Sequence, residues 1–515
     1  MRLRIRSTLV TLTCGALLAL VLWSLGFATI NSDAYYYLTV ARNVVETGRF
    51  TYDTIHSTNG FHWAWMGLLV VASAFIRLLG LALDGRALVV AAVVVSCTFY
   101  VAAARELVRI LSETRQPPEV KQIAPLLACL VFLEPNLIIL SINGLETCLF
   151  LFLLLRLVRL LSDEQPRDAL LTCMALTLVR IEGVVMAPFI IMSGHRDWSS
   201  RLRRSVMVLV PVVLILTLNY LADRSVLSNS SQAKAFWAHL ARERYLWNVP
   251  ARAEMILIAR DLTYIPGILF QFLLSIRDDR VLGKVVMALL GVVSYVAITR
   301  RSVVFDRLRS RPIYLLAWYG VVTWCAYKTL YFTPRSNQFA SQFAVKDYQS
   351  IWYFAPFSLL VALLLYLILS STGRTLAARS AVGFCLVVIL WIRALSSLPM
   401  GAGIEDDSAC QPPTPTAVYL AQNDDAFAYW YRLPVVALDG LVTGRRLSDG
   451  VTYLSALRDG GIERYLDDLS PRFIRVGTEQ LLRNLNVADE RIDAIRIRPV
   501  VHLCGMGEWY RLTSN

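Results

Sequence analysis

The sequence predicts a polytopic α-helical membrane protein with a small α/β domain at its C-terminal end. Of its 515 residues, 56% are hydrophobic and only 17% are charged, which is too apolar for a water-soluble protein of this size. Uncharged runs recur from residue 9 to residue 400, and at about 1.5 Å per residue they are long enough to cross about 30 Å of hydrocarbon. A soluble enzyme is therefore excluded.

The charge divides the chain into two parts. Residues 401–515 contain 12 Arg, no Lys and 16 acidic residues, a net charge of −4, which leaves +17 for residues 1–400 and gives the total of +13. We therefore predict a membrane module over 1–400 and a soluble domain over 401–515, which opens with a Gly- and Pro-rich linker. No Lys/Arg run resembles a nucleic-acid stripe, so nucleic acid is not an expected partner.

The first residues predict a retained membrane helix rather than a cleaved signal peptide. Arg2, Arg4 and Arg6 precede an apolar run over 8–30, which is longer than the apolar core of a signal peptide. Because cytoplasmic segments carry the excess of Arg and Lys, the N-terminus is expected in the cytoplasm, and Asp33 emerges on the far side.

Further apolar runs and basic loops follow along the membrane module. The runs lie near 63–82, 87–104, 122–142, 147–161, 169–194, 205–222, 262–276, 281–299, 312–332, 352–370 and 380–400. The basic loops lie at 105–121, 156–168, 195–204, 300–311 and 371–379. Placing every basic loop in the cytoplasm gives about nine full crossings, and up to about thirteen if the doubtful runs also cross. An odd number of crossings places the C-terminal domain outside the cytoplasm.

The same count identifies runs that do not cross completely. Between Asp33 and the basic loop 105–121 the number of crossings must be odd, although two apolar runs lie there. We expect 63–82 to lie along the outer face or to re-enter it. The run 169–194 joins two basic loops, so we expect a short hairpin, which bends around Arg180, Glu182 and Gly183.

The densest cluster of polar residues between membrane helices is 31–62, the first outer loop. Residues 34–47 have helical periodicity and predict an amphipathic helix on the bilayer surface. One face carries Tyr37, Val40, Ala41, Val44 and Val45, and Arg42, Asn43 and Glu46 lie on others. Asp33 at its start is either the N-cap of this helix or a carboxylate at the membrane boundary that acts as a general base.

Other ionisable groups are candidates because charge at membrane depth is costly. Arg180 and Glu182 at the bend are either functional or form a structural ion pair. Lys234, Arg335 and Lys346 are cations on the side where topology disfavours cations. They suit an anionic headgroup, the alternative being solvated loop charges or lipid contacts.

Cysteine and histidine give no sign of a metal site. The nine Cys contain no CxxC pair and have no metal-ligand spacing with the five His. Only Cys410 and Cys504 lie in the polar C-terminal domain, where a disulfide between them stays open.

Seven segments, in this order, resemble the landmarks of bacterial GT-C-fold glycosyltransferases, and most of all the arabinofuranosyltransferase-like enzymes of cell-envelope polysaccharides and pilin. They are Asp-Ala-Tyr-Tyr-Tyr at 33–37, Thr-Asn-Gly-Phe-His at 58–62, Asn-Gly-Leu-Glu-Thr at 143–147, Val-Arg-Ile-Glu-Gly at 179–183, Ser-Ser-Gln-Ala-Lys at 230–234, Trp-Tyr-Phe-Ala-Pro at 352–356 and Leu-Asp-Gly-Leu at 438–441. Two details depart from the family. Ser32-Asp33 replaces a frequent pair of acids, and Trp63-Ala-Trp65 replaces Pro-Leu-Trp.

The resemblance implies a multi-pass enzyme of the bacterial inner membrane with an extracytoplasmic C-terminal domain. It implies an inverting transfer of a sugar, arabinofuranose among the candidates, from a polyprenyl-phosphate donor to a cell-envelope glycan or a protein such as pilin. It also implies that Asp33 is the catalytic base. Metal dependence varies across GT-C enzymes, and no motif in this chain requires a metal or another cofactor.

Charge assigns the remaining roles. The leaving lipid phosphate needs cations rather than a protonated acid, and the candidates are Lys234, Arg180, Arg335 and Lys346. The attacking hydroxyl needs a single base, unlike the paired acids of glycosidases. We expect the sugar or acceptor to be positioned, or the base oriented, by Glu146, Glu182, Asn59, His56, His62 and Tyr36, although the two His could equally cap turns.

Three other classes stay open. A lipid-linked-sugar flippase or transporter should show broken helices in corresponding halves or inverted repeats, and the sequence shows neither. A non-enzymatic scaffold explains the C-terminal domain but not the acid at the exit of the first helix. An O-antigen polymerase or ligase predicts a large central outer loop with essential Arg or His, for which 223–261 offers Arg242, Arg244 and His239.

Overall fold

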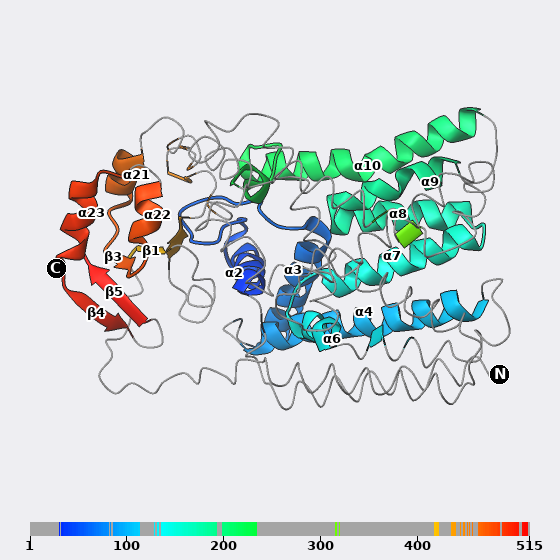
Figure 1. Ribbon diagram of the computed structural model, residues 1–515, viewed down its shortest axis with the longest axis horizontal. Coiled ribbons are helices and arrows are strands. Elements are labelled where there is room, and N and C mark those ends of the chain that lie inside the picture. The colour runs from blue at the N-terminus through cyan, green and yellow to red at the C-terminus, as the bar shows by residue number, and fades with distance from the viewer. Residues whose placement is uncertain are drawn as a thin grey trace, which may run out of the picture. The chain divides into compact units, whose positions relative to one another are not determined.

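The computed structural model describes two compact units of the chain (Figure 1). The described residues are 30, 32–81, 83, 86–113, 128, 131–132, 135–192, 198–233, 315–316, 319, 417–421, 434–438, 443, 446–448, 451, 453, 456, 462–484, 487–503 and 507–512. The first unit contains 93–212, and the second combines 30–92, 213–233 and the C-terminal domain. Outside the described residues lie Lys234, Arg335, Lys346, Cys410 and Cys504, together with the apolar runs at 8–30 and between 262 and 400 except for residues 30, 315, 316 and 319.

The first unit is helical. Its elements are α4 (Arg86–Glu113), α6 (Pro135–Ile142), α7 (Thr147–Ser162), α8 (Pro166–Val179), η1 (Ile181–Met186), α9 (Ala187–Met192) and α10 (Trp198–Asp223), of which α4 and α10 extend into the second unit. Within the described part of the chain, two helices are long and apolar enough to cross a membrane, 86–112 and 198–223. They contain the predicted runs 87–104 and 205–222, and α7 and α8 lie side by side (Figure 1).

Three predicted loops are shorter than expected. Helix α4 continues to Glu113 and α10 begins at Trp198, so parts of 105–121 and 195–204 are helical. Of the loop 156–168, only residues 163–165 lie between α7 and α8. Charge pairing explains the first case, because Glu106 is buried and its carboxylate accepts hydrogen bonds from Arg109 at 2.8 Å and Arg159 at 2.6 Å. An acid that neutralises the nearby Arg side chains lets the helix extend beyond its apolar run.

The predicted hairpin over 169–194 is present. Helix α8 ends at Val179, Arg180 takes an extended conformation (φ −150°, ψ 128°), and η1 and α9 then pack against α8. Gly183 makes this close return possible. A Cβ atom at this position would lie 2.7 Å from the Thr177 backbone nitrogen and 2.8 Å from the Leu176 carbonyl carbon.

Gly183→Ala is therefore expected to lower the free energy of unfolding by about 1–3 kcal/mol, the usual cost of overpacking against backbone that has no room to move. Gly67→Ala in α3 is the matched control, because no atom lies within 4 Å of its added Cβ and Ala favours a helix over Gly by about 0.5–1 kcal/mol. Thermal unfolding in detergent measures the stability of both variants. Equal unfolding temperatures for the two variants would contradict the close approach.

The second unit begins with α2 (Ser32–Thr47) and α3 (Trp63–Leu78). Helix α3 has 16 residues, so at about 1.5 Å per residue it is shorter than the hydrocarbon of a bilayer. That length fits a run that does not cross completely, although its place at the outer face stays a prediction.

Helix α2 differs from the surface helix that its periodicity suggested. Tyr37, Val40 and Ala41 are buried as expected, but Arg42 and Asn43 on the supposed polar faces are only 3% and 5% exposed. The reason is that polar partners lie within the fold. The Asn43 amide donates to the Thr51 carbonyl oxygen at 2.8 Å, which is a bond that helical periodicity alone does not reveal.

The C-terminal domain is a small α/β domain, as predicted. Its strands are β1 (Tyr419–Ala421), β2 (Val435–Ala437), β3 (Phe473–Arg475), β4 (Val500–Leu503) and β5 (Gly507–Arg511), and its helices are α21 (Ile462–Leu469), α22 (Glu479–Asn484) and α23 (Asp489–Arg496). The sheet has the order β2-β1-β3-β5-β4, with parallel pairs at β1 and antiparallel pairs at β5. Tyr419, Phe473 and Trp509 pack on one another and form its aromatic core.

Candidate functional site

Asp33 lies in the first turn of α2 and is half-buried. The helix begins at Ser32, so Asp33 is a helical residue and not the residue before the helix that an N-cap role requires. A carboxylate in the first turn of a helix is stabilised by the backbone N–H groups and the helix dipole. The position is therefore compatible with the predicted role of Asp33 as a general base, which stays a prediction.

Two tyrosines connect α2 to the Thr58–His62 motif. Tyr36 and Tyr37 follow Asp33 by three and four residues, so they lie on the same side of the helix. The Tyr36 hydroxyl lies 3.0 Å from the Thr58 hydroxyl, and the Tyr37 hydroxyl accepts the backbone N–H of His62 at 3.1 Å. The Tyr37 ring also stacks on His62, with 6.5 Å between ring centres. The motif is thus anchored to the helix that carries the predicted base.

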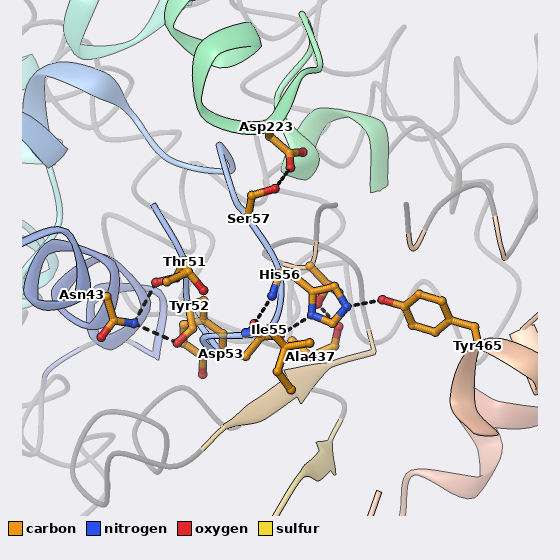
Figure 2. Close-up of polar contacts among 11 residues, drawn as sticks. Asn43, Thr51, Tyr52, Asp53, Ile55, His56, Ser57, Asp223, Ala437 and Tyr465 are labelled. Atoms are coloured by element: carbon orange, nitrogen blue, oxygen red, sulfur yellow. Dashed lines mark hydrogen bonds and ion pairs between the residues drawn. The ribbon is translucent and has the colours of Figure 1, made fainter. Parts of the chain in front are cut away.

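Residues 51–57 form a short polar hairpin, closed by an antiparallel bridge between Thr51 and Ser57 (Figure 2). Asp53 shapes its turn, because its Oδ1 accepts the backbone N–H groups of Ile55 at 2.9 Å and His56 at 2.7 Å. This is the local bonding for which Asp is favoured in turns. The side-chain amide of Asn43 in α2 donates to the backbone carbonyl oxygens of Thr51 and Tyr52, at the start of the hairpin.

His56 is completely buried and both of its ring nitrogens have protein partners (Figure 2). Its Nδ1 lies 2.6 Å from Oδ2 of Asp53, and its Nε2 is in contact with the hydroxyl of Tyr465 from α21. The His56 and Tyr465 rings are stacked, with 5.9 Å between their centres. Because both ring nitrogens of His56 contact protein groups, these contacts favour the alternative in which His56 holds a turn over the one in which it positions a sugar.

Asn59 joins the first outer loop to the segment after α10. Its side-chain oxygen accepts the backbone N–H of Asn229 at 2.7 Å. Its amide group donates to three carbonyl oxygens, those of Asn219 at 3.3 Å, Ser225 at 3.2 Å and Leu227 at 3.3 Å. The side chain is fully buried, so its four contacts replace all contact with water. The landmark 58–62 is thereby joined to residues 219–229, which come directly before the landmark 230–234 in the sequence.

A second acid lies beside the hairpin. The Ser57 hydroxyl donates to the carboxylate of Asp223, which is 5% exposed at the C-terminal end of α10 (Figure 2). The helix dipole disfavours an anion at this end. Asp53 and Asp223 were missed by sequence reasoning, and the only signal for Asp53 was its three-residue spacing from His56.

The bend after α8 brings together three predicted residues of the first unit. Arg180 is 3% exposed, and its Nη2 lies 3.1 Å from Glu182 while its Nη1 lies 3.8 Å from Glu146. Its guanidinium also lies over the Phe150 ring, 5.5 Å from the centre. The ion-pair alternative for Arg180 and Glu182 is thus confirmed, while their contact with a donor stays a prediction.

His62 lies directly before α3. It occupies the N-cap position of this helix, yet its side chain forms no capping bond to the helix, so it is not a turn cap there.

Among the residues that the structure describes, no cluster of three or more His, Cys, Asp or Glu is arranged to hold a metal ion.

No protein-family model and no curated protein matches this chain. Three chains of solved structures are similar to it, and two of them are as follows. One is ArnT from Cupriavidus metallidurans bound to undecaprenyl phosphate, with a TM-score of 0.42 and 13% identity over 97% of this chain and 98% of that chain. The other is the Archaeoglobus fulgidus oligosaccharyltransferase tethered with an acceptor peptide, with a TM-score of 0.40 and 13% identity over 89% of this chain and 66% of that chain.

A TM-score below 0.5 does not by itself establish a common fold. The function proposed for this chain therefore rests on its own residues.

Proposed function

We propose that the chain is an inverting glycosyltransferase of the GT-C type that uses a polyprenyl-phosphate-linked sugar on the extracytoplasmic face of the membrane. The observation that carries the proposal is the Asn59 junction. It links the loop after the Asp33 helix to Ser225 and Asn229, more than 160 residues away, and Lys234 follows Asn229 by five residues in the sequence. This link supports the proposal that the candidate base and the candidate phosphate-binding cation serve one site.

The cation serves the leaving group. When the bond between the anomeric carbon and the phosphate oxygen breaks, the lipid phosphate leaves as an anion and needs positive charge, not a proton. Lys234 is the leading candidate, because Gln232 and Asn229 before it are held by hydrogen bonds to Leu227 and Asn59. Arg335 and Lys346 are further candidates. Arg180 already faces two carboxylates, so its first role is the ion pair at the bend.

The base serves the acceptor. Asp33 takes the proton of the acceptor hydroxyl as that oxygen attacks the anomeric carbon from the face opposite the phosphate, which inverts the configuration. Tyr36 of this helix, together with Asn59 and His62 of the loop that follows it, positions the sugar or the acceptor or orients the base. The resemblance favours arabinofuranose as the sugar, and a cell-envelope glycan or pilin as the acceptor. We further propose a cytoplasmic N-terminus, an extracytoplasmic C-terminal domain and no required metal.

Purified protein in lipid nanodiscs, incubated with a panel of polyprenyl-phosphate sugars and an envelope glycan or pilin acceptor, tests the proposal. We expect mass spectrometry to detect free polyprenyl phosphate with one sugar of the panel, and NMR to show the inverted anomer in the product. Retention of configuration, or no release with any sugar, would overturn it. Sugar that crosses the bilayer while still linked to lipid would indicate the flippase instead.

A further inference from the structure

The C-terminal domain reaches the polar hairpin of the first outer loop through buried contacts. Asp53, His56 and Tyr465 are 1%, 0% and 2% exposed, so their polar atoms depend on one another and not on water. The backbones also pair: His56 bridges to Arg446, and the Leu447 N–H donates to the Ile55 carbonyl oxygen at 2.9 Å. The domain therefore continues the hairpin as an added strand segment.

Side-chain contacts hold Tyr465 in the position from which it reaches His56. The Arg446 guanidinium lies over the Tyr465 ring, 5.4 Å from its centre, and lies 3.4 Å from Asp468 of the same helix. Tyr465 is thereby held in the C-terminal domain, and its hydroxyl meets His56. Because Asp53 binds the His56 ring with one oxygen and the backbone of 55 and 56 with the other, a displaced imidazole would displace the turn itself.

The residues after this turn contact the helix that carries Asp33. Ser57 and Thr58 follow His56 directly, and they contact Asp223 at the end of α10 and Tyr36 of α2. Tyr36 is three residues from Asp33, which is one helical turn. An unbroken series of contacts thus runs from Tyr465 through His56 and Thr58 to the start of α2.

We infer that Tyr465 of the C-terminal domain is a positioning residue for the transfer reaction, acting through His56 on the loop beside Asp33. This rests on the proposed function and gives the C-terminal domain a part in the transfer step. The contact between Tyr465 and His56 is buried. Removing either partner leaves the other with an unsatisfied polar group in the protein interior, which is costly.

Hydrogen–deuterium exchange tests the link without any assay of activity. Tyr465→Phe keeps the ring and removes only the hydroxyl, so we expect amide exchange in residues 53–59 to rise about tenfold or more in the full-length protein. Tyr453→Phe is the matched control, because Tyr453 is a buried tyrosine of the same domain whose hydroxyl donates to the Leu438 carbonyl oxygen. It should leave exchange in 53–59 unchanged. Equal exchange in Tyr465→Phe and wild type would overturn the link.

Kinetics then separate positioning from acceptor capture. We expect Tyr465→Phe to lower kcat about tenfold with the KM for donor and acceptor unchanged, and Tyr453→Phe to behave as wild type. His56→Asn removes the same hydrogen bond from the loop side, so it should lower kcat by the same factor. The double variant should have a kcat no lower than that of either single variant. His56→Asn also keeps the test valid if Tyr465→Phe does not fold. A raised acceptor KM with kcat unchanged would overturn positioning. If wild type transfers no sugar, the proposed function fails, while the exchange experiment still decides the link.

Discussion

Asp33→Asn is expected to lower sugar transfer by about 1000-fold or more, while expression, membrane insertion and the unfolding temperature stay as in wild type. General base catalysis contributes about 100-fold to 10,000-fold, and an amide cannot take the proton of the acceptor hydroxyl. Asn is close to Asp in size and is accepted in the first turn of a helix, so α2 should form normally. The measurement is the rate of polyprenyl phosphate release with saturating donor and acceptor.

Glu46→Gln is the matched control, because Glu46 is an acid of the same helix near its other end and is exposed. The same loss of one negative charge should leave its transfer rate at the wild-type value. A wild-type rate in Asp33→Asn would remove the assignment of the base. Asp223→Asn and Asp53→Asn would then be the next variants to compare, since both acids are buried beside the first outer loop.

The parts of the fold that the sequence predicts well depend on local periodicity. The apolar run at 87–104 lies within α4, the run at 147–161 is α7, and the reversal near Arg180 follows from the position of one apolar run between two basic loops. Each of these inferences uses residues that are neighbours along the chain. Hydrophobic period and loop charge are signals of that kind.

The parts that the sequence did not reveal depend on distant partners. Asn43 looked like a surface residue because the carbonyl groups that it binds carry no signal in a side-chain pattern. His56 and Asn59 were recognised as polar candidates, but their partners Tyr465 and Asn229 are 409 and 170 residues away. A single sequence contains no information that pairs them. The resemblance supplied candidate roles, and the contacts indicate which candidates hold the loop.

Arg180→Gln is expected to lower the free energy of unfolding by about 3–5 kcal/mol, because it leaves the buried carboxylate of Glu146 and the half-buried carboxylate of Glu182 without the cation that faces them. Arg491→Gln is the matched control for the same substitution. Arg491 pairs with Asp467 at 2.5 Å, but the pair is exposed to solvent, so its loss should cost only about 0–1 kcal/mol. Thermal unfolding in detergent compares the two, and a similar loss in both would contradict a buried ion pair at the bend.

The triple variant Arg180→Gln, Glu146→Gln, Glu182→Gln separates structure from donor binding. It removes the cation together with both facing anions, so no buried charge of this group is left uncompensated, and we expect it to regain most of the stability that Arg180→Gln loses. If Arg180 acts only within the ion pair, the triple variant also regains the wild-type KM for the donor. A KM that stays raised in a stable triple variant would show that the ion pair is not the only role of this group, and would return Arg180 to the cations that hold the lipid phosphate, with Glu146 and Glu182 as the residues that position the sugar.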